Sequence, residues 1–168
     1  DSNGAVLVPT SNENKMGQIA HARGIGSMKS NDGFGNISNG AITQTYEIKK
    51  GQAKLTQSVT ETWSGEGGSY RNPGENLDGT KTSQSITVNY SYHEKDEDGH
   101  KVGQIKSATG EGTLKTSDGF NTTHGTIKQT YIILNGQAKL KSQTTETWSG
   151  FGSYNFPGEN LDGTKSQQ

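Results

Sequence analysis

The chain of 168 residues carries a long internal duplication, and this feature limits its possible folds more than any other. The hexapeptide TETWSG occupies residues 60–65 and again residues 145–150. After a short spacer, each copy is followed by PGENLDGTK, at 73–81 and 157–165. Such repeats are the sequence signature of a supersecondary unit that is used more than once.

The match continues upstream, where residues 16–34 resemble residues 102–120 and NGAITQTYEIKKGQAKL resembles HGTIKQTYIILNGQAKL. The offset between the copies falls from 86 to 84 through two single-residue differences in Gly-rich stretches. Changes of length cost little in such turns. We therefore expect two repeats, 1–84 and 85–168.

Each repeat predicts four β-strands. ITVNYSYHE places Ile86, Val88, Tyr90 and Tyr92 on one face by strict alternation, which is typical of a half-buried strand. Its expected counterpart is AVLVPT at residues 5–10, and NDGF, SDGF, KKGQ and LNGQ predict turns between further strands. No segment shows sustained helical periodicity, and the abundance of Thr and Gly also favours β-structure. The sequence predicts an all-β protein.

The small number of apolar residues suggests how the repeats combine. Leu, Ile, Val and Phe number 12 in the first repeat and 14 in the second, which is few for an independent domain of this size. We therefore expect residues 1–168 to form a single domain, an antiparallel β-barrel or sandwich of about eight strands with pseudo-twofold symmetry. Two separate domains are the alternative.

Alternation also predicts which residues share a face. We expect Leu55, Glu61 and Trp63 on one side of their strand, and their counterparts Leu140, Glu146 and Trp148 likewise. The glycines at positions 24, 26, 110 and 112 predict a bulge or a sharp bend. The shared core is expected to contain the following side chains: Ile42, Tyr46, Leu55, Ile127, Tyr131 and Leu140.

The loop after each TETWSG carries the strongest functional signal. It combines Trp and Tyr with Glu, Asn and Asp among glycines that let a ligand approach the backbone. An aromatic ring can stack on the C–H face of a sugar, while short polar side chains bind its vicinal hydroxyls. We therefore predict a lectin-like protein that binds glycans at two equivalent sites, one in each repeat. The expected ligand-binding residues are Trp63, Tyr70, Glu75, Asn76 and Asp78 in the first repeat, and Trp148, Tyr154, Glu159, Asn160 and Asp162 in the second.

Other interpretations of this loop remain open. It could be a structural loop in a matrix or adhesive module, with Asn and Asp forming turns and Leu77 and Leu161 closing a barrel end. Glu75, Asn76 and Asp78 could bind calcium, although their spacing differs from an EF-hand. A glycan-active enzyme is a further interpretation, in which Glu61 and Glu146 would converge as a carboxylate pair. Such a pair needs two different environments, and the near-identical copies make this less favourable. We expect no enzyme activity and no cofactor.

Composition excludes several classes of function. A net charge of −1 without basic clusters argues against nucleic acid as a partner. No apolar stretch is long enough to span a membrane, and there is no cysteine. The four histidines lack metal-ligand spacing.

A chain that opens at Asp1 is compatible with a processed form, so we expect a secreted or extracellular protein. The sequence leaves the sugar, the need for calcium and the oligomeric state open.

Overall fold

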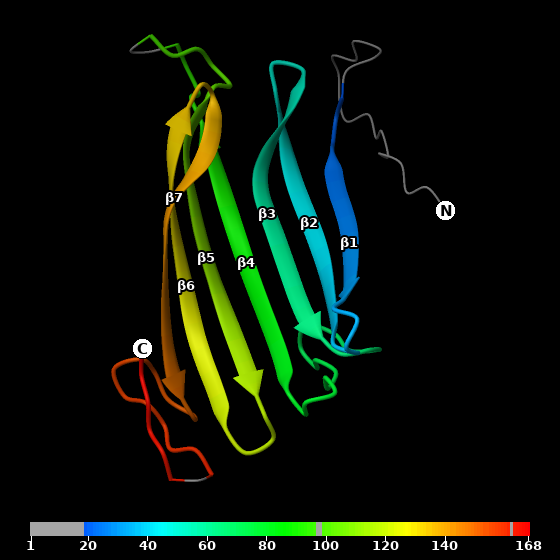
Figure 1. The fold of residues 1–168 in the computed structure, drawn as a ribbon. Coiled ribbons are helices and arrows are strands. Elements are labelled where there is room, and N and C mark those ends of the chain that lie inside the picture. Colours follow the sequence, from blue (N-terminus) through cyan, green and yellow to red (C-terminus); the bar gives the residue numbers. More distant parts are fainter. Residues whose placement is uncertain (1–18, 97–98, 162) are drawn as a thin grey trace.

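The computed structural model describes residues 19–96, 99–161 and 163–168, which form one sheet of seven antiparallel strands. Each strand pairs with its neighbours in chain order, so the sheet is an up-and-down meander with β1 and β7 at its edges (Figure 1). The sheet is not closed into a barrel. The expected strand at 5–10 lies outside the described residues. The strands are β1 Arg23–Asn31, β2 Ile37–Lys49, β3 Gln52–Ser64, β4 Lys81–Tyr92, β5 Ile105–Ser117, β6 Thr122–Leu134 and β7 Gln137–Ser149.

The expected turns are confirmed. The β2–β3 and β6–β7 connections are two-residue turns, and Lys50 and Asn135 adopt φ angles of 49° and 50° before Gly51 and Gly136. Two successive positive φ angles match the twist of a two-residue hairpin. In the β1–β2 loop the carboxylate of Asp32 accepts backbone hydrogen bonds from positions 34 and 36.

The sheet has a more apolar face and a polar face. In the centre of the sheet, Ile86 of β4 lies opposite Gly112 of β5, which in turn lies opposite Ile127 of β6. Among the described residues only Ala108 and Ile127 are fully buried apolar side chains. Because a single layer of strands covers little surface, the sheet has a thin core. This agrees with the low apolar content of the sequence.

The face assignment for the TETWSG strands was wrong. A β-bulge shifts the β2–β3 register between Thr45 and Tyr46, so Tyr46 pairs with Leu55 and Thr45 with Gln57. The extra residue reverses the alternation along the strand. Leu55 therefore lies on the apolar face, whereas Glu61 and Trp63 lie on the polar face. The same shift in β6–β7 places Leu140 opposite Tyr131 and separates it from Glu146 and Trp148.

The predicted bulge at the strand glycines was also wrong, because the register of β1 and β5 is regular through them. Gly24 and Gly110 instead make room for a glutamine of the next strand. A Cβ atom would lie 2.6 Å from the Gln44 Oε1 at position 24 and 2.5 Å from the Gln129 Oε1 at position 110. Each of these oxygens accepts the hydroxyl proton of a tyrosine two residues later in its strand, at 2.9 and 2.8 Å.

The predicted core is correct only in part. Ile127 is 3% exposed, and Ile42, Tyr46, Leu55 and Tyr131 are half-buried. Leu140, in contrast, is 53% exposed. It belongs to the edge strand β7, which pairs with β6 on one side and, among the described strands, has no neighbour on the other.

The apolar face also carries a group of tyrosines. Burial raises the pKa of the Tyr90, Tyr92 and Tyr131 hydroxyls. The Tyr92 hydroxyl donates to the carbonyl oxygen of Leu55 at 2.7 Å. This hydrogen bond ties β4 to β3 across the expected boundary between the repeats, which itself falls inside β4.

Candidate functional site

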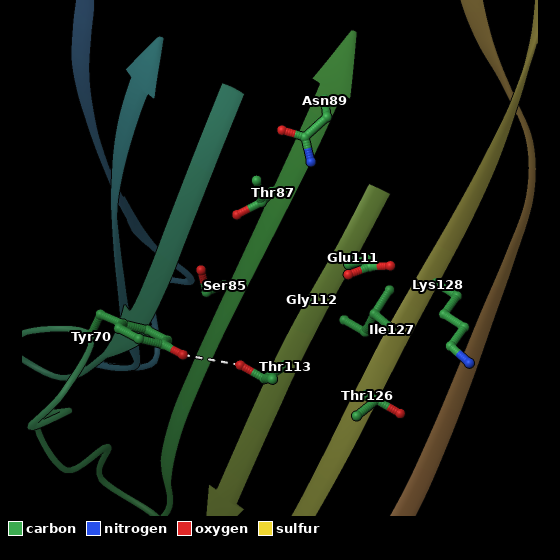
Figure 2. A pocket seen from close by; sticks show the side chains of 10 residues that line it. All are labelled: Tyr70, Ser85, Thr87, Asn89, Glu111, Gly112, Thr113, Thr126, Ile127 and Lys128. Carbon is green, nitrogen blue, oxygen red and sulfur yellow. Dashed lines mark hydrogen bonds between the residues drawn. The ribbon is translucent and has the colours of Figure 1, made fainter. Parts of the chain in front are cut away.

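A groove lies on the polar face over β4, β5 and β6 (Figure 2). Its volume is about 480 Å³. Strand side chains form its floor, and one aromatic side chain from the β3–β4 loop stands at its end. The residues that line it are Tyr70, Ser85, Thr87, Asn89, Glu111, Gly112, Thr113, Thr126, Ile127 and Lys128.

Alternation along β4 explains the floor of this groove. Ile86 and Val88 turn to the apolar face, so Ser85, Thr87 and Asn89 point to the other side. Strand register then places a polar residue of β5 beside each of them. Neighbouring strands are about 4.8 Å apart, and the result is a close array of hydroxyl, amide and charged groups.

The two charged groups of the groove come from adjacent strands. Glu111 of β5 is the register partner of Lys128 of β6. Both residues are exposed, and the lysine ammonium points away from the carboxylate in Figure 2. The groove therefore offers a hydrogen-bond acceptor and a cationic donor to a ligand in addition to its hydroxyl groups.

Tyr70 closes one end of the groove. The oxygen atoms of its hydroxyl and of the Thr113 hydroxyl are 3.1 Å apart, which fixes the ring over β4 and β5. A second hollow continues on the other side of Tyr70, toward Lys115 and His124. Burial, and then the charge of Lys115, lowers the pKa of the His124 imidazole. The neutral imidazole is therefore favoured at this end.

Most of the predicted polar residues of the first loop bind other parts of the loop. The Asp78 carboxylate accepts hydrogen bonds from the Thr80 amide at 2.9 Å and from the Thr80 hydroxyl at 2.6 Å, and both lower the pKa of Asp78. Asn76 donates to the same hydroxyl at 3.4 Å. Glu75 forms an exposed ion pair with Lys81 at 3.2 Å. These contacts fix the shape of the loop.

The second loop repeats this pattern. Asn160 donates its side-chain amide to Thr164 at 3.1 Å, and Glu159 lies 3.8 Å from the Lys165 ammonium. Tyr154 is half-buried but does not line the groove. Asp162 lies outside the described residues.

The two tryptophans lie on the polar face but outside the groove. Trp63 is the register partner of Asn39 on β2 and of Ser83 on β4. Trp148 stacks with His124, with ring centroids 6.2 Å apart. The indole nitrogens of both tryptophans are buried without a hydrogen-bond partner among the described residues. Of the nine predicted residues that the structure describes, only Tyr70 lines the groove.

The floor residues were missed by the sequence interpretation. Their alternation in ITVNYS was visible, but it was used only to assign the apolar face. The groove depends on the register between β4, β5 and β6, and the alternation within one strand does not specify that register.

The proposed carboxylate pair of a glycan-active enzyme is not brought together. Glu61 is on β3 and Glu146 is on β7, four strand positions apart. At about 4.8 Å per strand they are roughly 19 Å apart along the sheet. Direct hydrolysis by such a pair requires a separation of about 5–9.5 Å.

The comparisons with known proteins add no family to these observations. No protein-family model, curated protein or solved structure matches the chain. In the residues that the structure describes, no helix is long and apolar enough to cross a membrane. The same residues include no group of three or more His, Asp or Glu side chains arranged to hold a metal ion.

Proposed function

We propose that this protein binds carbohydrate in the polar groove over β4, β5 and β6. The observation that supports this function most directly is the lining of the groove: hydroxyl, amide, carboxylate and ammonium groups beside the ring of Tyr70. Sugars present several hydroxyl groups and an apolar C–H face, which suit such a surface. The extracellular location expected from the sequence fits this function.

We also propose a second site around the loop that contains Trp148, Tyr154, Glu159, Asn160 and Asp162. Its support is the repeated loop, in which Ser149, like Ser64, donates its hydroxyl to a loop carbonyl, at 2.9 Å and 2.8 Å respectively. The finer architecture expected from the sequence, eight strands in two repeats related by a pseudo-twofold axis, is part of this proposal. The recurrence of the same register and the same bulge in β2–β3 and β6–β7 supports it.

A structural or adhesive module is the second candidate function. The observation that favours it is the set of hydrogen bonds that Asn76, Asp78 and Thr80 form within their own loop. In such a protein the loops would only close the end of the sheet, and the groove would bind no sugar.

A glycan array followed by calorimetry tests the proposal. Tyr70→Ala should weaken glycan binding by at least tenfold, because it removes the ring that bounds the groove. A tenfold change in affinity corresponds to about 1.4 kcal/mol. Thr87→Val should also weaken binding, since it replaces a groove hydroxyl by a methyl group.

Thr109→Val is the matched control. Thr109 is exposed on the same face but does not line the groove, so its replacement should leave the affinity unchanged. Failure of every glycan to bind would support the structural module instead. A stoichiometry of one per chain, with binding that Tyr70→Ala weakens, would retain the groove and eliminate the second site.

A further inference from the structure

In the part of the chain that the structure describes, the outer edge of β7 differs from the corresponding edge of β3 because no strand of the sheet lies beside it. β3 (QAKLTQSVTETWS) and β7 (QAKLKSQTTETWS) have nearly the same sequence, but β3 lies between β2 and β4. Residues 54–60 of β3 are half-buried, whereas residues 139–145 of β7 are exposed. We attribute the lower exposure of β3 to β4, which lies beside its outer edge.

A short extended segment already pairs with the C-terminal end of this edge. Thr147 and Gln168 exchange backbone hydrogen bonds at 2.8 and 2.9 Å, and the Ser149 amide donates to the carbonyl of Ser166 at 2.9 Å. The Ser166 amide also donates to the Ser149 hydroxyl at 2.8 Å. Residues 166–168 are therefore antiparallel to β7.

The position of residues 166–168 is the one that the start of β4 occupies on β3. There the Thr82 amide donates to the Ser64 hydroxyl, also at 2.8 Å, and Trp63 pairs with Ser83 as Trp148 pairs with Gln167. The edge of β7 thus selects the same register for an added strand as β3 does for β4.

Toward the N-terminal end of β7, around Leu140, the described structure lacks the contacts that β4 makes with β3. Tyr92 donates its hydroxyl to the Leu55 carbonyl, and Leu55 is half-buried. Leu140, the counterpart of Leu55, is 53% exposed, and no tyrosine in the described part of the chain takes the place of Tyr92 beside it. An exposed leucine beside free backbone groups at a sheet edge is a site for strand addition.

We propose that the outer edge of β7, from Lys139 to Glu146, binds an extended strand of a partner protein. This strand runs antiparallel to β7 and has the chemistry of β4. The strand carries aliphatic side chains at alternate positions on the apolar face and a tyrosine that packs on Leu140. It continues the register of residues 166–168. This proposal does not depend on glycan binding, and its test uses no sugar.

The probe is a peptide with the sequence of residues 85–92, SITVNYSY. In the register of β3 and β4, its first residue would lie opposite Glu146 and its fifth opposite Ser142, so it would not displace residues 166–168. Hydrogen exchange of the full chain is measured with and without excess peptide. Because Thr147 donates outward, the amides of Gln143 and Thr145 also face outward, and we expect their exchange to slow by at least about tenfold.

Two variants sharpen the test. Thr145→Pro removes a backbone N–H that points away from β6, so no hydrogen bond between β6 and β7 is lost. Proline is tolerated at such positions of an edge strand. It should abolish protection at Gln143, and Gln143→Pro serves as a second variant on the same side. A peptide with phenylalanine in place of Tyr92 should bind about 2- to 10-fold more weakly, because it lacks one hydrogen bond.

Three results would overturn the proposal. One is unchanged exchange of Gln143 and Thr145 up to the solubility limit of the peptide. Another is strong protection of these amides before any peptide is added, which would mean that another segment of the chain already covers the edge. The third is a wild-type dimer in sedimentation that Thr145→Pro converts to a monomer, which would assign the edge to a second copy.

Discussion

At the scale of single residues, identical positions in the two repeats experience different surroundings because the strands beside them differ. Gly26 of β1 and Gly112 of β5 are counterparts in sequence. Among the described residues, a Cβ atom on Gly26 would meet only Ile42, at 3.9 Å. On Gly112 it would lie 2.4 Å from the backbone oxygen of Ser85 and 3.0 Å from Ile86. The presence of β4 beside β5 causes this difference.

Gly112→Ala should therefore destabilise the protein by about 1–3 kcal/mol, because a backbone atom of the adjacent strand must move. Gly26→Ala should be neutral or stabilising by up to about 1 kcal/mol, since it restricts the unfolded chain without a clash. Urea denaturation of both variants measures the difference. Equal destabilisation would show that β1 also has a close neighbour on its outer side.

At the scale of elements, each repeated loop is joined to the sheet by a buried serine hydroxyl at the same position, Ser64 and Ser149. Ser64 donates to the carbonyl of Gly74 at 2.8 Å and accepts the Thr82 amide at 2.8 Å. Its exposed fraction is 4%, so the hydroxyl joins the end of β3, the loop and the start of β4 away from water. This hydrogen-bonding role gives a structural reason for the serine in both copies of WSG.

Ser64→Ala should destabilise the protein by about 1–3 kcal/mol, because it removes a buried hydroxyl and leaves the Gly74 carbonyl and the Thr82 amide without this partner. The control is Ser69→Ala in the same loop, where the side chain is exposed and the change should stay within about 0.5 kcal/mol. Thermal melting followed by circular dichroism compares the two variants. If Ser64→Ala melted at the wild-type temperature, the loop would be anchored by other contacts.

The elements that sequence reasoning predicted well were those fixed by local chemistry. The hairpins at Lys50–Gly51 and Asn135–Gly136 and the alternation of β4 are local, and the structure confirms them. The bulge opposite Thr45–Tyr46 was missed because a single extra residue leaves no composition signal in a strand rich in Thr and Gln. That omission reversed the faces of Leu55 and Trp63. In the candidate site, Tyr70 was predicted, whereas the floor depends on the register between three consecutive strands, β4, β5 and β6.

At the scale of the whole molecule, contacts between the two repeats join them into one sheet. β4 contributes the Tyr92 hydrogen bond to Leu55, and Asn89 accepts a hydrogen bond from Gln57 at 3.0 Å. Both buried apolar side chains, Ala108 and Ile127, lie in the second repeat, but the residues around them still form only one layer. A single sheet of four strands would bury less of its apolar face than the seven-stranded sheet does.

We therefore expect residues 85–168, expressed alone, to show no cooperative thermal transition. The fragment loses β3, so the half-buried faces of Ile86, Val88 and Tyr92 become more exposed, and a small core cannot offset the conformational entropy of folding. The fragment 81–168 is the control, because it retains the whole of β4 and separates the effect of a cut strand from that of a lost neighbour. Calorimetry and sedimentation of both fragments provide the measurement. A soluble monomer of 81–168 with one sharp transition would mean that the second repeat is a domain in its own right, and the protein would then consist of two domains.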